Sequence, residues 1–244
     1  MNIDHVEIQQ LMRQMVDLGI ADNLKLWVHS GLVKTRTSGS DLFVPKAYDI
    51  SGEENDAAQA TNDNQPKLVS DGMEFDGSDD SLDAPNADTI IPSFPLTIIL
   101  WGRYTSVQDG FFIVIHRHTN SGTLINIQVF NEALVCRIRN NDDTSLVTYD
   151  LDVSLNTYAM LSVSFNFNRI GEVYVNSTKK TTTETCLDSI AAYPINMGVF
   201  YNAWTESESN NLQGTLNDIR IFNTALSATE ISAIYNATKS KYGH

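Results

Sequence analysis

The sequence predicts an all-β fold in which antiparallel sheets stack as a sandwich, with one short amphipathic helix at each end of the chain. Most of the chain alternates apolar and polar residues with a period of two, and these stretches are rich in Ile, Val, Phe, Tyr and Thr. Clusters of Gly, Asn, Asp and Ser divide them. No segment of helical length separates neighbouring strands, so we expect hairpins and antiparallel sheets, stacked in two layers or closed as a barrel.

The first predicted element is a helix over residues 4–18. It begins with a capping box formed by Asp4 and Glu7, and Gly19 is suited to end it. Its apolar face contains Ile8, Leu11, Met12 and Met15. Because methionine surfaces adapt to varied partners, we expect residues 1–21 to form a docking or oligomerisation element. The alternative is that this helix covers the chain's own sandwich.

The next segment, residues 30–66, is polar, irregular and rich in Gly, Ser, Asn and Asp. We therefore expect a long surface connection there. Strands are predicted over residues 96–104, 110–118, 123–130, 133–140, 158–167, 172–181, 195–202 and 215–222.

The last predicted element is a helix over residues 228–240. Ser227 and Glu230 form a second capping box in front of it. No linker divides the chain, so residues 22–244 are predicted to form one domain that includes this helix.

Both ends of the sequence resemble a known family. The segments LKLWV (24–28), YDISGEENDAAQATNDNQPKLVSDGMEFDGSDDSLDAP (48–85) and LQGTLNDIRIFNTALSATEISAIYN (212–236) resemble laminin-G-like jelly rolls of the concanavalin A-like lectin/glucanase superfamily. The resemblance implies a two-sheet antiparallel jelly-roll sandwich over roughly residues 22–240.

The acidic segment EFDGSDDSL (74–82) corresponds to a strand, a tight turn and a strand in that family, and we expect a positive φ at Gly77. Some relatives hold a structural calcium ion there, with oxygen ligands from the turn and from an acid of the final strand. Asn217 occupies the first acid position of that strand in this chain. The candidate calcium ligands are Asp76, Asp79, Asp80 and Asp218, and calcium is the single cofactor to consider. The alternative is an acidic turn whose carboxylates accept backbone hydrogen bonds.

The superfamily includes glycoside hydrolases, whose catalytic strand carries carboxylates in a pattern close to E-x-D-x-x-E. Glu54 and Asp56 begin this pattern, but Gln59 stands where the second glutamate is needed. Glu206 and Glu208 lack a third member. We therefore predict that the protein is not an enzyme.

The segment VFYNAWTESESNN (199–211) is a candidate glycan site. Tyr201, Asn202 and Trp204 combine aromatic faces with an amide, which suits stacking on a sugar ring and hydrogen bonding to its hydroxyls. The alternative is that Trp204 packs under its own loop.

Two histidines, His116 and His118, share one face of a predicted strand and could form half of a transition-metal site. The sequence shows no third ligand, so we expect solvated histidines at the end of the strand.

The composition argues against several partners. The net charge is −14, and no cluster of Lys and Arg is present to bind nucleic acid or an anionic membrane. No apolar stretch has the length of about 18 residues that a membrane span needs. The first residues do not resemble a signal peptide, so we expect synthesis in a cytoplasm, with release by lysis as one route out.

The resemblance and the missing signal together favour a non-catalytic virion accessory protein of a tailed phage. We expect it on the virion surface as a capsid decoration or as a tail or fibre component. Its expected partners are other virion proteins, further copies of itself in a homo-oligomer, and a cell-surface glycan. The alternative is a free-standing carbohydrate-binding module or lectin of a bacterium, in its cytoplasm or on its surface by a non-Sec route. A divergent glycoside hydrolase is the third candidate.

Overall fold

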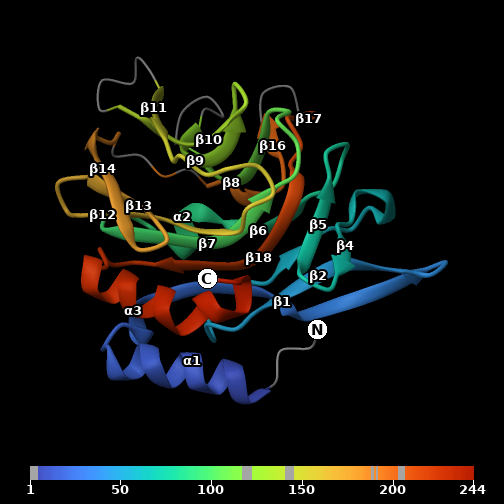
Figure 1. Cartoon of the computed structure of the whole chain (residues 1–244), viewed down its shortest axis with the longest axis horizontal. Helices are drawn as coiled ribbons and strands as arrows, with labels where there is room; N and C mark the ends of the chain where they lie inside the picture. Colours follow the sequence, from blue (N-terminus) through green and yellow to red (C-terminus); the bar gives the residue numbers. More distant parts are fainter. Residues whose placement is uncertain (1–4, 117–122, 141–145, 188–189, 191, 203–206) are drawn as a thin grey trace.

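The computed structural model of the chain describes residues 5–116, 123–140, 146–187, 190, 192–202 and 207–244. It shows three layers: a front sheet, a back sheet, and a layer of two helices on the outer face of the back sheet (Figure 1). Every strand pair in the described residues is antiparallel. The predicted all-β sandwich is confirmed.

Each strand of a sheet is hydrogen-bonded to the next strand named. The front sheet contains β11 (Leu146–Asp150), β10 (Ala133–Arg139), β9 (Thr123–Phe130), β8 (Gly110–His116), β15 (Pro194–Met197), β6 (Leu82–Asn86) and β3 (Ala57–Ala58). The back sheet contains β5 (Gly72–Asp76), β18 (Gln213–Phe222), β7 (Leu96–Tyr104), β12 (Ala159–Phe165), β13 (Ile170–Val175) and β14 (Thr178–Thr185), with β1 (Leu24–Ser38) paired to β18. The strands β2 (Asp41–Asp49) and β4 (Lys67–Val69) join the two sheets at one edge.

The remaining elements are short. The strands β16 (Phe200–Asn202) and β17 (Ser207–Ser209) form a separate hairpin. The helices are α1 (His5–Asp17), α2 (Ala87–Ile90) and α3 (Ala228–Thr238), and the 3-10 turns are η1 (Ala21–Asn23), η2 (Asn62–Asn64) and η3 (Lys239–Tyr242). Among the described residues, no helix has both the length and the apolar character to cross a membrane.

The alternation within each strand of the back sheet builds two cores. In β7, Ile98 and Leu100 point into the core between the sheets, while Ile99 and Trp101 point toward the helices. A strand with apolar residues on both faces must be covered on both, because successive side chains point to opposite sides. The helices supply the second cover.

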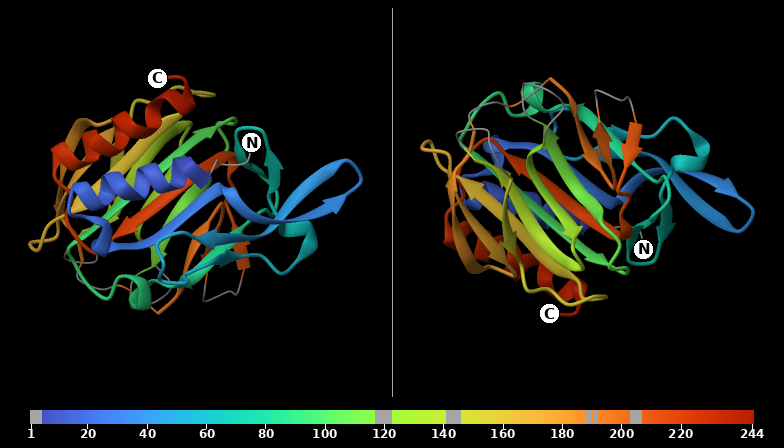
Figure 2. Two further views of the ribbon diagram at one scale, coloured as in Figure 1. Left: turned by 90° about the horizontal axis from the view of Figure 1, so that it is seen from below. Right: turned by 90° about the horizontal axis from the view of Figure 1, so that it is seen from above.

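The helix α1 lies beside α3 on the back sheet (Figure 2). Gln14 of α1 donates a hydrogen bond to the carbonyl of Ala233 in α3, at 3.1 Å. Leu11 and Met15 are buried in the core beneath the two helices, whereas Ile8 and Met12 are half-buried at its margin. Leu11 and Met15 therefore serve the chain's own sandwich, which is the alternative that the sequence left open. A docking role for α1 stays a prediction.

The ends of the helices agree with the sequence analysis where they are described. Gly19 has a φ of 70°, as a residue that ends a helix in the left-handed region does. The side chain of Ser227 accepts a hydrogen bond from the Glu230 backbone, and the Glu230 side chain accepts one from the Ser227 backbone, so the second capping box is confirmed. Asp4 lies outside the described residues.

The prediction of an irregular connection over residues 30–66 is wrong for its first part. Residues up to 49 form a long hairpin of β1 and β2 that projects from the sandwich (Figure 1). Outside the sandwich neither face of these strands is covered by a second layer, so their residues are mostly exposed or half-buried. Such a hairpin lacks the apolar alternation from which strands are predicted.

Candidate functional site

The outer face of the front sheet carries a row of side chains that crosses its strands. In each strand, the residue between two core residues points away from the core; Arg137, for example, lies between the core residues Cys136 and Ile138. The strand register brings these outward residues opposite one another. The row, called the polar row below, runs through Lys46, Ala58, Asp83, Asn196, Val114, Asn126, Arg137 and Thr148.

Buried Asn196 of the polar row links the half-buried Asp83 to the buried His116 of β8 through hydrogen bonds. Asn196 donates to the carboxylate of Asp83 at 2.7 Å, and its carbonyl oxygen lies 2.6 Å from Nε2 of His116. These bonds place the ring proton of His116 on Nε2. Burial raises the pKa of Asp83, against the opposing effects of Asn196 and His116. His116 is 1% exposed, so the expectation that it is solvated is wrong, while His118 lies outside the described residues.

The next part of the polar row and Gln128 beside it contain buried polar atoms that have no partner among the described residues. Both polar atoms of the Asn126 amide, the carbonyl oxygen of Gln128 and Nε of Arg137 have no hydrogen-bond partner among the described residues. Asn126 is 1% exposed. Folded proteins pair nearly all buried polar groups, because each unpaired one costs free energy. Such a cluster indicates a surface whose hydrogen bonds are completed by something other than the described residues.

The opposite end of the polar row opens into a groove with a volume of about 530 Å³. The groove shares Lys46 and Ala58 with the row and is lined further by polar side chains, among them Lys34, Arg36, Gln59, Asn62 and Gln65. Two of its cations are held by neighbours. Lys46 forms an ion pair with Asp56, and Arg36 donates to the side chain of Gln65 and the carbonyl of Asn62. Gln65 is buried and Gln59 donates to the Ser81 hydroxyl at 2.5 Å, so Asn62 is the exposed amide among the residues that line the groove.

The predicted glycan residues lie next to this face. Tyr201 and Asn202 belong to β16, whose hairpin with β17 lies beside β8 and β15 of the front sheet (Figure 1). Trp204 lies outside the described residues. Binding of a sugar by Tyr201, Asn202 and Trp204 stays a prediction.

The acidic turn brings together three of the four predicted calcium ligands. Carboxylate oxygens of Asp76, Asp79 and Asp80 lie within 4.8 Å of one another. Burial, together with the negative charges of Asp76, Asp79 and Glu74, raises the pKa of Asp80 to about 7, whereas its bond from the Asp76 amide opposes this. Three oxygen ligands of this kind fit a calcium ion, which would neutralise them.

The same turn also has the features of the alternative. Gly77 has a φ of 85°, as predicted. The carboxylate of Asp76 accepts from the amide of Ser78 at 2.7 Å, and that of Asp80 accepts from the amide of Asp76 at 2.9 Å. The carboxylates therefore hold the turn without a cation, and calcium stays a prediction.

Asp218 is not part of that cluster. Gln213 is the β18 residue opposite Asp76, and Asp218 lies five residues further along the strand. Its carboxylate is buried and accepts two hydrogen bonds from Arg220, at 3.0 and 2.6 Å. The prediction of Asp218 as a calcium ligand is wrong, because the register of β18 and β5 sets it apart from the turn and Arg220 binds its carboxylate.

The acids nearest to the catalytic pattern have structural roles. Asp56 accepts from the backbone amide of Asp49 at 2.7 Å and pairs with Lys46. Asp49 in turn accepts from the amides of Trp27 and Asn55, at 2.8 and 3.0 Å. These bonds hold the β2–β3 connection against β1, so Asp56 belongs to a fold motif.

The polar row was not predicted from the sequence. The available signal was the polar member of each apolar strand, such as Asn126 in TLINIQVF or Asn196 in INM. The periodicity shows that these residues point outward. The register that brings them side by side comes from the structure.

Comparison with known proteins bears on the fold. The sequence pattern of a family described as "Concanavalin A-like lectin/glucanases superfamily" matches residues 76–232. The chain belongs to the concanavalin A-like lectin/glucanases superfamily. The predicted laminin-G-like resemblance is thereby confirmed. No curated protein matches this superfamily member in sequence.

Several solved structures share the lectin-type fold. One is the botulinum neurotoxin serotype D ligand binding domain in complex with N-acetylneuraminic acid, with a TM-score of 0.63 and 14% identity over 90% of this chain and 52% of that chain. Another is the binding domain of Paraclostridial mosquitocidal protein 1, with a TM-score of 0.62 and 14% identity over 89% and 52%. The sialidase of Trypanosoma rangeli in complex with sialic acid has a TM-score of 0.65 and 13% identity over 91% and 34%. The chain thus spans about half the length of the two binding domains, and identities this low show the fold alone.

Proposed function

We propose that the protein is a non-catalytic glycan-binding domain whose site is the groove and the polar row of the front sheet. The observation that carries this proposal is the row of mostly polar side chains on one face, interrupted by Ala58 and Val114, which leads from an open groove to buried amide atoms without partners among the described residues. An amide offers a donor and an acceptor together, and so matches the hydroxyl groups of a sugar.

The lectin-type fold supports the same proposal. Two of the structural neighbours are complexes with N-acetylneuraminic acid or sialic acid. A site that binds a glycan without cleaving it needs no paired acid and nucleophile, and Asp56, the acid closest to such a pattern, is engaged in structural bonds.

A glycan array with the full-length chain, followed by titration of the glycans that bind, tests the proposal. Asn62 is exposed in the groove, so Asn62→Ala should weaken binding about tenfold, as loss of one good polar contact does. The matched control is Asn168→Ala, an exposed asparagine between β12 and β13, which should bind as the parent does. Equal weakening by both variants, or an array without binding, would overturn the site. Cleavage of a bound glycan would overturn the non-catalytic role.

The proposal extends to a role as an accessory protein of a virion. It rests on the resemblance to tailed-phage structural proteins, and display on a particle with further copies of the chain and other virion proteins stays a prediction. The lectin of a bacterium remains its alternative. Light scattering of the purified chain, followed by mass spectrometry of particles or of cell-surface fractions, separates the two roles.

A further inference from the structure

The groove on the front sheet is positively charged, in contrast to the chain as a whole. Its described lining contains three cations, Lys34, Arg36 and Lys46, and no acidic residue. The whole chain has 30 acidic residues and 16 Lys and Arg, so acidic residues outnumber basic ones nearly two to one. A groove lined by three cations in such a chain is a local region of positive charge, which concentrates anions.

Two of these cations lie directly opposite each other in the hairpin of β1 and β2. Lys34 of β1 is the register partner of Lys46 of β2. Residues that are directly opposite lie on one face with Cβ atoms about 5 Å apart, and like charges in such a pair destabilise the sheet. The bond to Asp56 raises the pKa of Lys46, which therefore stays charged. Lys34 is exposed, and the described residues offer it no hydrogen-bond or ion-pair partner.

Arg36 is held in the groove by neutral acceptors. Its Nε donates to the side-chain oxygen of Gln65 at 2.9 Å, and its Nη2 donates to the carbonyl of Asn62 at 2.8 Å. Gln65 is itself buried and donates to the carbonyl of Gln59 at 3.0 Å, while the guanidinium lies over the ring of Phe43 at 4.9 Å. These contacts orient the guanidinium without neutralising it, and Nη1 has no partner among the described residues. A guanidinium fixed in this way is a pre-organised donor to an anionic oxygen.

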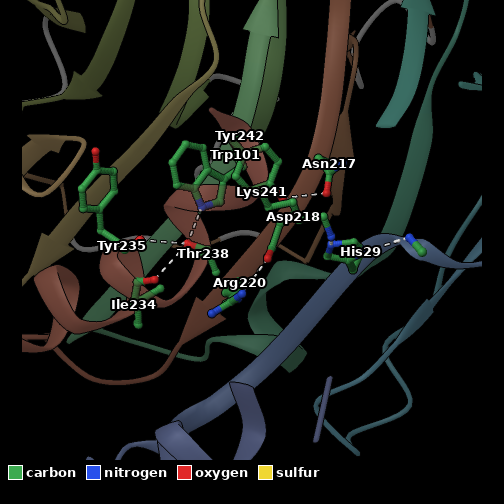
Figure 3. Close-up of polar contacts among 11 residues, drawn as sticks. His29, Trp101, Asn217, Asp218, Arg220, Ile234, Tyr235, Thr238, Lys241 and Tyr242 are labelled. Atoms are coloured by element: carbon green, nitrogen blue, oxygen red, sulfur yellow. Dashed lines mark hydrogen bonds and ion pairs between the residues drawn. The ribbon is translucent and has the colours of Figure 1, made fainter. Parts of the chain in front are cut away.

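In the polar pocket beside the helices, by contrast, an arginine is paired with a carboxylate. This pocket has a volume of about 390 Å³ and is lined by residues of β1, β18 and η3, among others. Arg103, which lines it, pairs with Asp71 at 2.8 Å. On β18, Arg220 pairs with Asp218 at 2.6 Å (Figure 3). The groove differs in that no carboxylate of the described residues pairs with Lys34 or with Arg36.

We propose that the groove takes an anionic glycan, whose carboxylate, sulfate or phosphate group is bound by Lys34 and Arg36. The anionic group supplies to these two cations the negative charge that Asp56 supplies to Lys46. The exposed amide of Asn62, in the same groove, bonds to a hydroxyl of the sugar. This inference rests on the proposed glycan-binding function and names the class of glycan.

An array of matched acidic and neutral oligosaccharides tests the class of glycan with the full-length chain. Its pairs are oligogalacturonate and its methyl ester, sulfated and unsulfated oligomers of N-acetyllactosamine, and phosphorylated and unphosphorylated oligomannose. We expect an acidic member to bind at least about tenfold more tightly than its neutral partner, and the pair that shows this identifies the anionic group. Its affinity should fall as NaCl is raised from about 0.05 to about 0.5 M, because salt screens exposed charges.

Lys34→Gln tests the residues of the site. The change removes a charge and should weaken binding of the acidic member about tenfold, while binding of the neutral member stays the same. Lys239→Gln is the control, because Lys239 lies outside the groove, in η3, where it donates to Asn236 at 2.8 Å. This control should bind both members as the parent does. Asn62→Ala should weaken both members alike, since it removes a contact to the sugar and not to the charge.

The outcomes separate this inference from the function on which it rests. Neutral glycans that bind as tightly as their acidic partners would overturn the anionic class and leave the glycan-binding function standing. A loss of affinity in Asn62→Ala without a loss in Lys34→Gln would do the same. An array on which no glycan binds would overturn both. Melting curves of the three variants verify that each is folded.

Discussion

Trp101 and Asn126 both carry buried polar groups, but only the group of Trp101 has a hydrogen-bond partner among the described residues. The indole nitrogen of Trp101 is paired with Thr238, which itself donates to the carbonyl of Ile234 at 2.9 Å. The amide of Asn126 has no partner among the described residues. Since a buried unpaired group costs free energy, the first residue stabilises the fold and the second is retained at a cost.

Thr238→Val tests the first of these residues. Valine has the shape of threonine but cannot accept the indole hydrogen bond, so the buried nitrogen of Trp101 is left unpaired. We expect the free energy of unfolding to fall by about 1–3 kcal/mol, measured by urea denaturation. Thr178→Val is the control, because Thr178 is exposed in β14 and its replacement should change stability by less than about 0.5 kcal/mol. Equal losses in the two variants would contradict the assignment.

Asn126→Leu tests the second residue. Leucine has the same branched arrangement of side-chain heavy atoms as asparagine and needs no hydrogen bonds, so the free energy of unfolding should stay the same or rise by about 1 kcal/mol. Affinity for the glycans found on the array should fall in the same variant. A loss of stability in Asn126→Leu would show that the amide of Asn126 contributes to the stability of the fold.

His29 should make stability depend on pH. Burial lowers the pKa of its imidazole well below 6.5, and the nearby positive charges of Lys241 and Arg220 lower it further. Between its folded and unfolded pKa values the unfolded chain binds a proton that the folded chain does not, so stability is complete above about pH 6.5 and is lost as the pH falls below it. His29→Gln should lose less stability than the parent between about pH 7.5 and pH 5. Identical losses of stability in the parent and in His29→Gln, measured by urea titration at the two pH values, would contradict this.

Residues with local roles were predictable from the sequence, and residues with distant partners were not. Gly77 and its neighbouring acids form the expected turn, because an Asp side chain that accepts from an amide two residues away needs only local sequence. Asp218 pairs with Arg220 and is separated from the acidic turn by the register of β18 and β5. The polar row depends on register in every strand that it crosses.

Among the elements, α1 combines the properties of a structural helix and an exposed one. Met15 points into the core of the helix layer and is 1% exposed, whereas its neighbour Val16 is 62% exposed. The helix is thus fixed to the sandwich through one face and leaves the other available. The expected interface of the chain, if α1 takes part in it, includes the face that carries Val16.

Met15→Lys should release α1 from the back sheet. A lysine at this position would bury a charge, and the helix alone is too short to persist in water. We expect hydrogen exchange to accelerate in residues 5–17 and the strands of the sandwich core to remain protected. Val16→Lys places the same charge on the exposed face and should leave exchange in α1 unchanged. Exchange in α1 that is slow in both variants would show that Met15 does not hold the helix.

The sequence identified the two terminal helices and most strands of the sandwich, because each carries its own periodicity or cap, whereas the four-residue helix α2 was not predicted. It did not identify the projecting part of β1 and β2. Those strands lie outside the two packed layers, and only the buried half of β1, with Leu26, Trp27 and Val28, shows the apolar character of a covered strand. Periodicity reports burial, so an unburied hairpin escapes it.

For the whole molecule, the sequence predicts the fold better than it predicts which surfaces bind a ligand. The stacked sheets and the superfamily were both predicted and are both shown. The molecule has a groove on the front sheet and a separate polar pocket beside the helices, with no lining residue in common. Each site joins residues from several strands that are far apart along the chain, and its composition was therefore out of reach of local patterns.

The strand β18 lies in the interior of the back sheet, where it is bonded to β1, β5 and β7, yet it is the last strand of the chain. During translation, the first strand leaves the ribosome long before the strand that it must pair with has been made. The back sheet can close only after residues 213–222 have been made, since non-local pairing waits for both partners. Nascent chains halted before residue 213 should therefore remain sensitive to protease, because they lack the strand that joins β1, β5 and β7.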